Sequence, residues 1–391
     1  MTGPWLDTSS ARSLASQRGV GAGVSGARFR RQPTAGHRPI MRGTRWWLAS
    51  LAIALGGGYA RAQPAEIVQM SAQNQFSSAD ISRLAGWLEE TAVRFSKARD
   101  QKERQRVTGQ LTKLIDDEKA TREFKARLGA EMAKAYRPLI GGTELDPALD
   151  VVVLLDRLPF GGTQSAMIAA LASPHAAVRY RGAEGLRKLR GSLRQASDYE
   201  PVIDALAQAG AAETDPLVLR RIYEALDYHA VVKDFAGSEQ LAKAISTVLE
   251  TRLQTLQQTG GRRPEADIAG FAAAARTFAG LTDGATVKRR LATDLARFLA
   301  FYCNRYGQLG PSGGGTSLRE VAKACEDALA AMLRAIDGGP SPPPEPQRVA
   351  TRMAAGADAK AVQQSLAAWI GGDKPGVLNA DPLRLPVGLR D

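Results

Sequence analysis

The side chains best suited to catalysis or metal binding are few in this chain. Its 391 residues include only three histidines and two cysteines. His175 and His229 could serve as bases or metal ligands, but neither has a nearby cysteine or a histidine one helical turn away. The pattern indicates structural histidines near helix ends, and it predicts neither a metal site nor a cofactor.

Adjacent carboxylates are the second candidate for chemistry, because a pair at a suitable separation can hydrolyse glycosides. Glu89-Glu90 and Asp116-Asp117 are such pairs. Neighbouring residues of a helix diverge by about 100° around its axis, so a solvated helix face is the better interpretation. The chain has no serine-hydrolase, zinc-protease or phosphate-loop motif. We therefore predict that it is not an enzyme. The alternative is an all-α hydrolase of the cell envelope whose carboxylate site is not recognisable from the sequence.

Two glycine-rich stretches resemble nucleotide-binding loops only in part. Gly21–Gly26 reads G-x-G-x-x-G, but no predicted strand precedes it and no predicted helix follows it. Gly313–Gly315 lacks the lysine of a phosphate loop. We expect the second stretch to be a turn before a helix.

A row of arginines is the strongest candidate for binding. Arg179, Arg187 and Arg190 follow one predicted helix, and Arg220 and Arg221 occupy the corresponding place in the next helical pair. Apolar residues form the opposite stripe of the first helix, so the arginines are expected to face outward. They form either an ordinary solvated face or a ridge that binds an acidic protein partner.

Most of the basic excess of the chain lies at one end. Of the formal net charge of +12, residues 1–62 contribute +8, through nine arginines and a single acid, Asp7. The rest of the chain has an ordinary charge balance and no alternation of basic runs with aromatic residues. This distribution argues against a nucleic-acid partner.

Residues 41–62 have the pattern of an export signal. A basic start at Met41 is followed by a short apolar stretch and by Ala60-Arg61-Ala62, with predicted cleavage between Ala62 and Gln63. The apolar stretch is shorter than the roughly 20 residues that span a bilayer, so contact with a membrane is expected only through the signal. Residues 1–40 lack apolar periodicity, and we interpret them as a non-native or disordered extension. The predicted location is the periplasm or the cell exterior.

The two cysteines are candidates for a disulfide in an oxidising compartment. Cys303 and Cys325 lie on consecutive predicted helices on either side of a glycine-rich turn. A bridge between them would contribute about 3 kcal/mol by the loop-entropy argument. The alternative is two buried thiols packed as small apolar groups.

From residue 77 onward, apolar residues recur at spacings of three and four, and no sustained alternation occurs, so we predict an all-α protein. Ser77 or Ser78 is expected to cap the first helix. The predicted helices outside the central part of the chain cover residues 79–97, 101–117, 119–137, 238–258, 265–280, 284–306, 317–336 and 357–370.

Residues 146–230 contain two similar helical pairs. Pro174 lies in the turn of the first pair, and Val178-Arg179 opens its second helix. Val178 and Val218 are 40 positions apart, within the period of about 40 to 47 residues of HEAT repeats. The segment thus resembles a HEAT (armadillo-like) α-solenoid, although Leu219 stands where the second copy would carry arginine. The resemblance implies a stack of helical pairs that binds other proteins.

These features predict four parts in the mature chain. Residues 63–140 form charged N-terminal helices, and residues 143–337 form an irregular α-solenoid with HEAT-like pairs. The proline-rich stretch 338–347 is expected to be an extended linker. Residues 348–391 would then be a separate helix and tail. The function predicted from the sequence is an exported, non-enzymatic scaffold that binds a protein partner of unknown identity.

Overall fold

The computed structural model describes residues 65–98, 100–260, 264–313 and 315–386. Helices are the only regular secondary structure in this part of the chain, which confirms the predicted all-α class. The predicted signal, its cleavage position at Ala62 and Gln63, and the Gly21–Gly26 stretch lie outside the described residues. None of the described helices combines the length and apolar character needed to cross a bilayer.

The α-helices are α1 (Ala65–Ser71), α2 (Ser78–Lys97), α3 (Gln101–Asp116), α4 (Arg122–Ala135), α5 (Arg137–Ile140), α6 (Leu145–Asp156), α7 (Gln164–Leu171), α8 (Ala176–Leu189), α9 (Ala196–Ala212), α10 (Pro216–Leu226), α11 (Ser238–Thr259), α12 (Asp267–Gly280), α13 (Ala285–Gly313), α14 (Gly315–Arg334), α15 (Val349–Ala354) and α16 (Ala359–Ile370). Short 3₁₀ turns lie at Gly161–Thr163, Tyr228–Ala230, Pro264–Ala266, Glu345–Gln347 and Val377–Asn379.

The N-terminal helices begin where capping residues stand. The Ser77 side chain accepts a hydrogen bond from the Asp80 backbone N–H, and the Asp80 carboxylate accepts one from the Ser77 N–H. This reciprocal pair satisfies donors that the first turn of a helix leaves free. Leu84, Leu88 and Phe95 then lie on one buried face of α2, as their spacing predicts.

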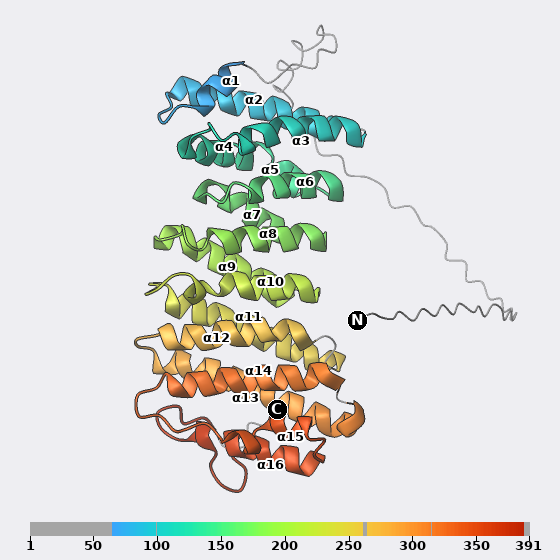
Figure 1. Ribbon diagram of the computed structural model, residues 1–391, viewed down its shortest axis with the longest axis vertical. Helices are drawn as coiled ribbons and strands as arrows, with labels where there is room; N and C mark the ends of the chain where they lie inside the picture. The colour runs from blue at the N-terminus through green and yellow to red at the C-terminus, as the bar shows by residue number, and fades with distance from the viewer. Residues whose placement is uncertain (1–64, 99, 261–263, 314, 387–391) are drawn as a thin grey trace, which may run out of the picture. The chain divides into compact units, whose positions relative to one another are not determined.

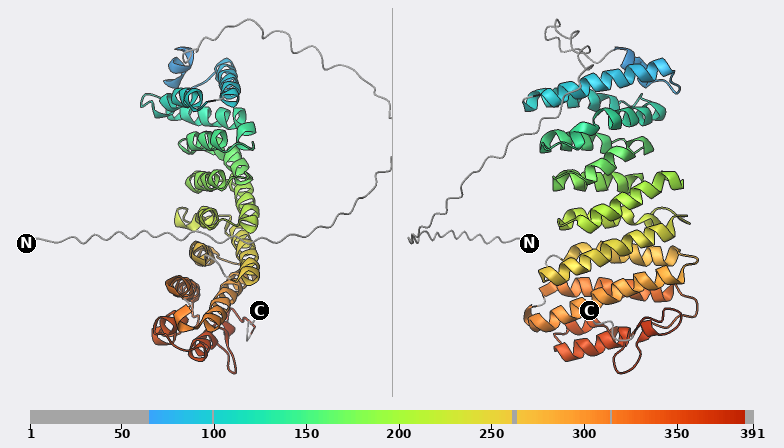
Figure 2. Two further views of the ribbon diagram at one scale, coloured as in Figure 1. Left: turned by 90° about the vertical axis from the view of Figure 1, so that its right-hand side faces the viewer. Right: turned by 180° about the vertical axis from the view of Figure 1, so that it is seen from behind.

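From α6 onward the helices form two layers (Figure 1, Figure 2). We call α6, α8, α10, α12 and α14 the front layer, because each contacts the next in this order and they face the viewer in Figure 1. The back layer is α7, α9, α11, α13 and α16, which also contact one another in sequence. Each pair therefore buries its apolar stripe against its neighbours in the chain.

Small residues allow the two helices of a pair to approach closely. A Cβ at Gly185 of α8 would lie 2.5 Å from the Met167 Sδ atom of α7, and one at Gly182 would lie 2.8 Å from the Ala170 Cβ atom. A side chain at Gly182 would also lie 2.9 Å from the Met167 carbonyl oxygen, so it would force the helices apart, whereas one at Gly185 would require the Met167 side chain to move. Gly182 thus limits the separation of α7 and α8.

Polar bridges connect successive pairs within each layer. In the front layer, Lys188 Nζ of α8 lies 2.8 Å from the Asp156 Oδ2 atom of α6. In the back layer, Gln240 Nε2 of α11 donates to Asp204 Oδ1 of α9 at 2.9 Å. These bridges supplement the apolar contacts and help to fix the register of neighbouring helices.

The proline-rich stretch does not separate an independent part of the chain, contrary to the prediction from the sequence. The helices that follow it pack on the stack, α15 against α14 and α16 against α13. The Glu326 carboxylate of α14 accepts hydrogen bonds from the Val349 and Ala350 N–H groups and from Trp369 Nε1, at 2.7 to 2.8 Å. The predicted tail also packs inward, since Leu378 and Leu383 are buried.

Candidate functional site

The five arginines predicted to form a partner ridge lie on or beside α8 and α10, but they differ in accessibility. Arg190 is only 4% exposed, and its guanidinium donates to the Asp227 carbonyl oxygen. Its assignment to a surface ridge is therefore wrong. The helical pattern could not reveal this, because the acceptor lies 37 positions away in the chain.

The Arg179 guanidinium is also occupied by contacts within the fold. Its guanidinium makes a bidentate contact with the Glu213 carboxylate, at 2.7 and 2.9 Å, and donates to the carbonyl oxygens of Ser173 and Pro174. The Glu213 side chain is 2% exposed. The pair therefore ties the start of α8 to the loop before α10, and the hydrogen bond with Glu213 raises the pKa of Arg179.

The remaining arginines join α8 to α10 through a shared set of carboxylates. Arg187 and Arg221 both contact Glu184, at 2.8 and 3.0 Å, and Arg220 contacts Glu224 at 3.0 Å. The hydrogen bond from Arg187 is the main cause of the lowered pKa of Glu184. The structure thus brings three ridge residues, Arg187, Arg220 and Arg221, into one network.

Most cations of this network are more exposed than the acids that they contact, and the exception is Arg221, which is 23% exposed beside Glu224 at 27%. We call six cations of α8, α10 and α12 the basic face: Arg181, Arg187, Lys188, Arg220, Arg221 and Arg276. The Arg220 side chain is 63% exposed and that of Arg276 is 48% exposed. The carboxylate partner of Arg276, Asp227, is only 8% exposed. A molecule that approaches this face meets N–H donors first.

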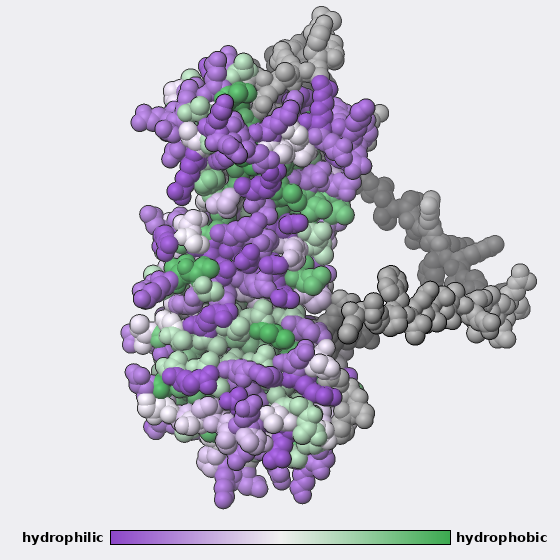
Figure 3. Space-filling model, viewed as in Figure 1, coloured by the Kyte–Doolittle hydropathy of each residue, from purple (hydrophilic) through white to green (hydrophobic). Residues whose placement is uncertain are grey.

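Apolar groups adjoin the basic face. Leu217, near the start of α10, is 65% exposed, more than any other large hydrophobic side chain of the described residues. The outward side of α12 carries small or partly exposed residues that include Ile268, Ala269 and Ala272. Figure 3 shows the resulting pattern, with hydrophilic groups over α8 and α10 and paler, more apolar groups over α12.

Sequence reasoning missed two members of this surface. Leu217 stands one position before the buried stripe of α10, and only the fold shows that nothing covers it. Arg276 lies in a helix that otherwise reads as alanine-rich, and its partner Asp227 is 49 positions away. Neither residue forms a local motif in the chain.

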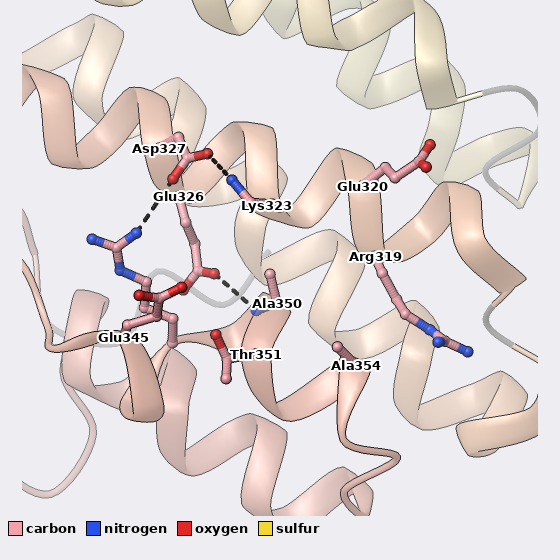
Figure 4. Close-up of a pocket in the computed structure, with 10 residues that line it drawn as sticks. Arg319, Glu320, Lys323, Glu326, Asp327, Glu345, Ala350, Thr351 and Ala354 are labelled. Carbon is pink, nitrogen blue, oxygen red and sulfur yellow. Dashed lines mark hydrogen bonds and ion pairs between the residues drawn. The ribbon is translucent and has the colours of Figure 1, made fainter.

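A pocket of about 290 Å³ lies between α14 and α15 (Figure 4). It is lined by three cations and four acids: Arg319, Lys323, Arg348, Glu320, Glu326, Asp327 and Glu345. Lys323 and Arg348 both contact Asp327, and burial raises the pKa of Glu326. Since Glu326 already accepts three hydrogen bonds, we interpret it as the anchor of α15 and not as a free base.

The histidines have structural contacts. His175 Nε2 lies 2.8 Å from the Thr143 carbonyl oxygen, and His229 Nε2 lies 3.0 Å from Ser238 Oγ. Ser238 donates its hydroxyl hydrogen to the Phe235 carbonyl, so His229 is placed to donate to Ser238 and not to accept its proton. Burial lowers the pKa of His229.

The carboxylate of Asp227, two residues before His229, is bound by Arg276. The arrangement therefore contains a serine, a histidine and an acid close together without the hydrogen-bond order of a catalytic triad.

Cys303 and Cys325 are both buried free thiols, and the structure contains no disulfide between them. Cys325 Sγ donates to the Leu295 carbonyl oxygen at 3.2 Å. Burial raises the pKa of both thiols well above the usual value, which keeps them protonated.

The remaining candidates do not assemble into a site. Glu89 and Glu90 are exposed on α2, while the Asp116 carboxylate pairs with Arg157. In the described part of the chain, no three His, Cys, Asp or Glu residues form a group that could hold a metal ion.

No family model matches this chain, and no curated protein matches it. The basic face and the adjoining apolar groups are thus the site that its own geometry supports best.

Proposed function

We propose that this protein is an exported, non-enzymatic scaffold whose helical stack is a HEAT-like α-solenoid and whose front layer binds a protein partner. Support for the architecture comes from the contacts between successive pairs, which place α6, α8, α10, α12 and α14 side by side. Stacks of this kind present extended surfaces suited to holding other proteins.

The observation that carries the proposal is the composition of the surface over α8, α10 and α12. Exposed arginines and a leucine that is 65% exposed lie together there, beside the small residues of α12. Arginine is enriched at protein interfaces, and exposed apolar side chains supply the buried area that stabilises a complex. The carboxylates of Glu184, Glu224 and Asp227 hold the guanidinium groups in place, which lowers the entropy lost on binding.

Export is part of the same proposal, and it rests on the signal pattern that ends at Ala62. Cleavage there would leave Gln63 as the N-terminus of the mature protein. The mature chain would then lie in the periplasm or outside the cell, with the stack free to meet its partner.

Site-specific photo-crosslinking tests the binding proposal. A photoreactive amino acid replaces Arg220 of the front layer, and a matched control carries it at Glu200, an exposed residue of the back layer. We expect one saturable crosslinked partner from the cell envelope at position 220 and not at position 200, and it should bind again when both proteins are purified. Equal crosslinking at both positions, or none at either, would contradict the proposal.

The same sample tests export. Mass spectrometry of the mature protein should give an N-terminal peptide that begins at Gln63. A protein that retains residues 41–62 would contradict export by cleavage but would leave the binding proposal standing.

A further inference from the structure

The charges of the basic face indicate the chemical character of the partner, an inference that rests on the proposed function. Apart from the Arg221–Glu224 pair, the cations of this face are more exposed than the acids that they contact. The Asp156 side chain is 7% exposed, whereas those of Lys188 and Arg181, which approach it at 2.8 and 3.9 Å, are 37% and 44% exposed. The positive ends of these ion pairs therefore face solvent. Complementary charge across an interface steers association and selects the partner.

Several guanidinium groups keep donors available. Arg276 contacts Asp227 through Nε and Nη2, so its Nη1 group is directed to neither carboxylate oxygen. Arg220 contacts Glu224 through Nε alone. A guanidinium carries five N–H donors in a planar fork that matches a carboxylate. These arginines can therefore bind a second carboxylate without giving up the first.

The back layer has the opposite character at the same level of the stack. Helix α9 carries Asp198, Glu200 and Asp204 and has no lysine or arginine. At this level of the stack, α9 therefore differs from the basic face in the sign of its charge. An acidic segment would be attracted to the basic face and repelled by α9.

The apolar neighbours specify a second property of the partner. Leu217 lies three and four residues before Arg220 and Arg221, on the same side of α10. On α12 the outward positions include Ala269 and Ala272, whose short side chains let another helix come close. A purely charged ligand would leave these groups uncovered.

We propose that the front layer binds an acidic amphipathic segment of a protein partner, with carboxylates on the basic face and apolar side chains on Leu217 and α12. Single-stranded nucleic acid is the less suitable occupant, because it uses aromatic rings as stacking platforms. The Tyr180 ring is already covered by the Arg221 guanidinium, whose central carbon lies 4.9 Å from the ring centroid, so it is not free to stack on a base.

Fluorescence anisotropy with a defined probe tests this inference. The probe is a labelled helical peptide of about 18 residues, five turns of helix, with leucines on one side and glutamates on the other. We expect saturable binding to the full chain that weakens as salt is raised. The double variant R181Q/R220Q should bind the peptide about tenfold more weakly, because each lost contact between charges contributes modestly. These substitutions leave Lys188 to pair with Asp156.

Matched controls separate local contacts from net charge. The variant K102Q/K113Q removes two exposed cations of α3 and should leave the affinity unchanged. Likewise, L217A should weaken binding about fivefold, whereas V93A, at an exposed valine of α2, should not. Equal losses in the test and control variants would overturn the inference.

Three other outcomes would also overturn it. One is no binding of the peptide; a partner still crosslinked at position 220 would then show that only this inference fails and the proposed function stands. Another is tighter binding of duplex DNA than of the peptide, lost in R181Q/R220Q. The last outcome is self-association. If the mass of the protein alone in solution rises with its concentration, and if both R181Q/R220Q and E200Q/D204N abolish that rise, the occupant is a second copy of this chain.

Discussion

Replacing Asp294 with asparagine should stabilise the folded protein at neutral pH. Asp294 lies on α13 and is 4% exposed, and its carboxylate accepts a hydrogen bond from the Ser246 hydroxyl of α11. Burial raises its pKa from 3.8 to about 6, opposed by the Ser246 hydrogen bond and by the nearby charge of Arg290, while Glu250 adds to the rise. The folded state therefore holds an ionised carboxylate above pH 6 at a cost in free energy.

The size of this cost follows from the two pKa values. At 1.36 kcal/mol per pKa unit, the difference between 3.8 and about 6 corresponds to about 3 kcal/mol. Between these values the unfolded chain binds fewer protons than the folded one, so the unfolding free energy of the wild type falls as the pH rises from about 4 to about 6. Asparagine keeps an acceptor for Ser246 and carries no charge, so D294N avoids this loss.

Urea unfolding followed by circular dichroism at pH 4, 6 and 8 tests the reasoning. The unfolding free energy of D294N should exceed that of the wild type by about 1 to 3 kcal/mol at pH 8, and this difference should shrink toward zero at pH 4. The comparison cancels other titrating groups such as Asp267, which both proteins share. E90Q, at an exposed carboxylate of α2, is the control and should change stability by less than about 0.5 kcal/mol at every pH. A D294N difference that is independent of pH, or a loss of stability at pH 8, would refute the explanation.

Three further substitutions test buried contacts. D267A should destabilise the protein by about 3 to 5 kcal/mol in urea unfolding, because Asp267 is a buried partner of Arg252, and a loss below 1 kcal/mol would contradict this. E326A should speed hydrogen exchange in α15 and α16 while α8 stays protected, since it removes the acceptor of three hydrogen bonds. R179A should cost about 2 to 4 kcal/mol by leaving Glu213 buried without its cation; a thermal midpoint equal to that of the wild type would rule this out.

The helices could be predicted closely from the sequence, because their signals are local. The predicted stretch 79–97 corresponds to Ser78–Lys97 in the structure, and 238–258 corresponds to Ser238–Thr259. In both, apolar residues at spacings of three and four mark the buried face. Ser77 could be identified as a cap because its partner Asp80 is three residues away.

The site could be predicted only in part, because its contacts join residues far apart in the chain. The row that contains Arg187, Arg220 and Arg221 was visible as a charge pattern, but the burial of Arg190 depends on Asp227. The docking of the last helices was missed for the same reason. A run of prolines indicates an extended backbone, and it gives no information on whether Glu326 will bind the segment that follows.

The polar bridges between neighbouring pairs have a mechanical consequence. Because Asp156 links α6 to α8 and Asp204 links α9 to α11, each bridge resists the separation of adjacent pairs and none spans the whole stack. Under a pulling force applied at its ends, such a chain should lengthen in successive steps, one helical pair at a time. The pairs that remain folded would keep their own contacts while the next pair detaches.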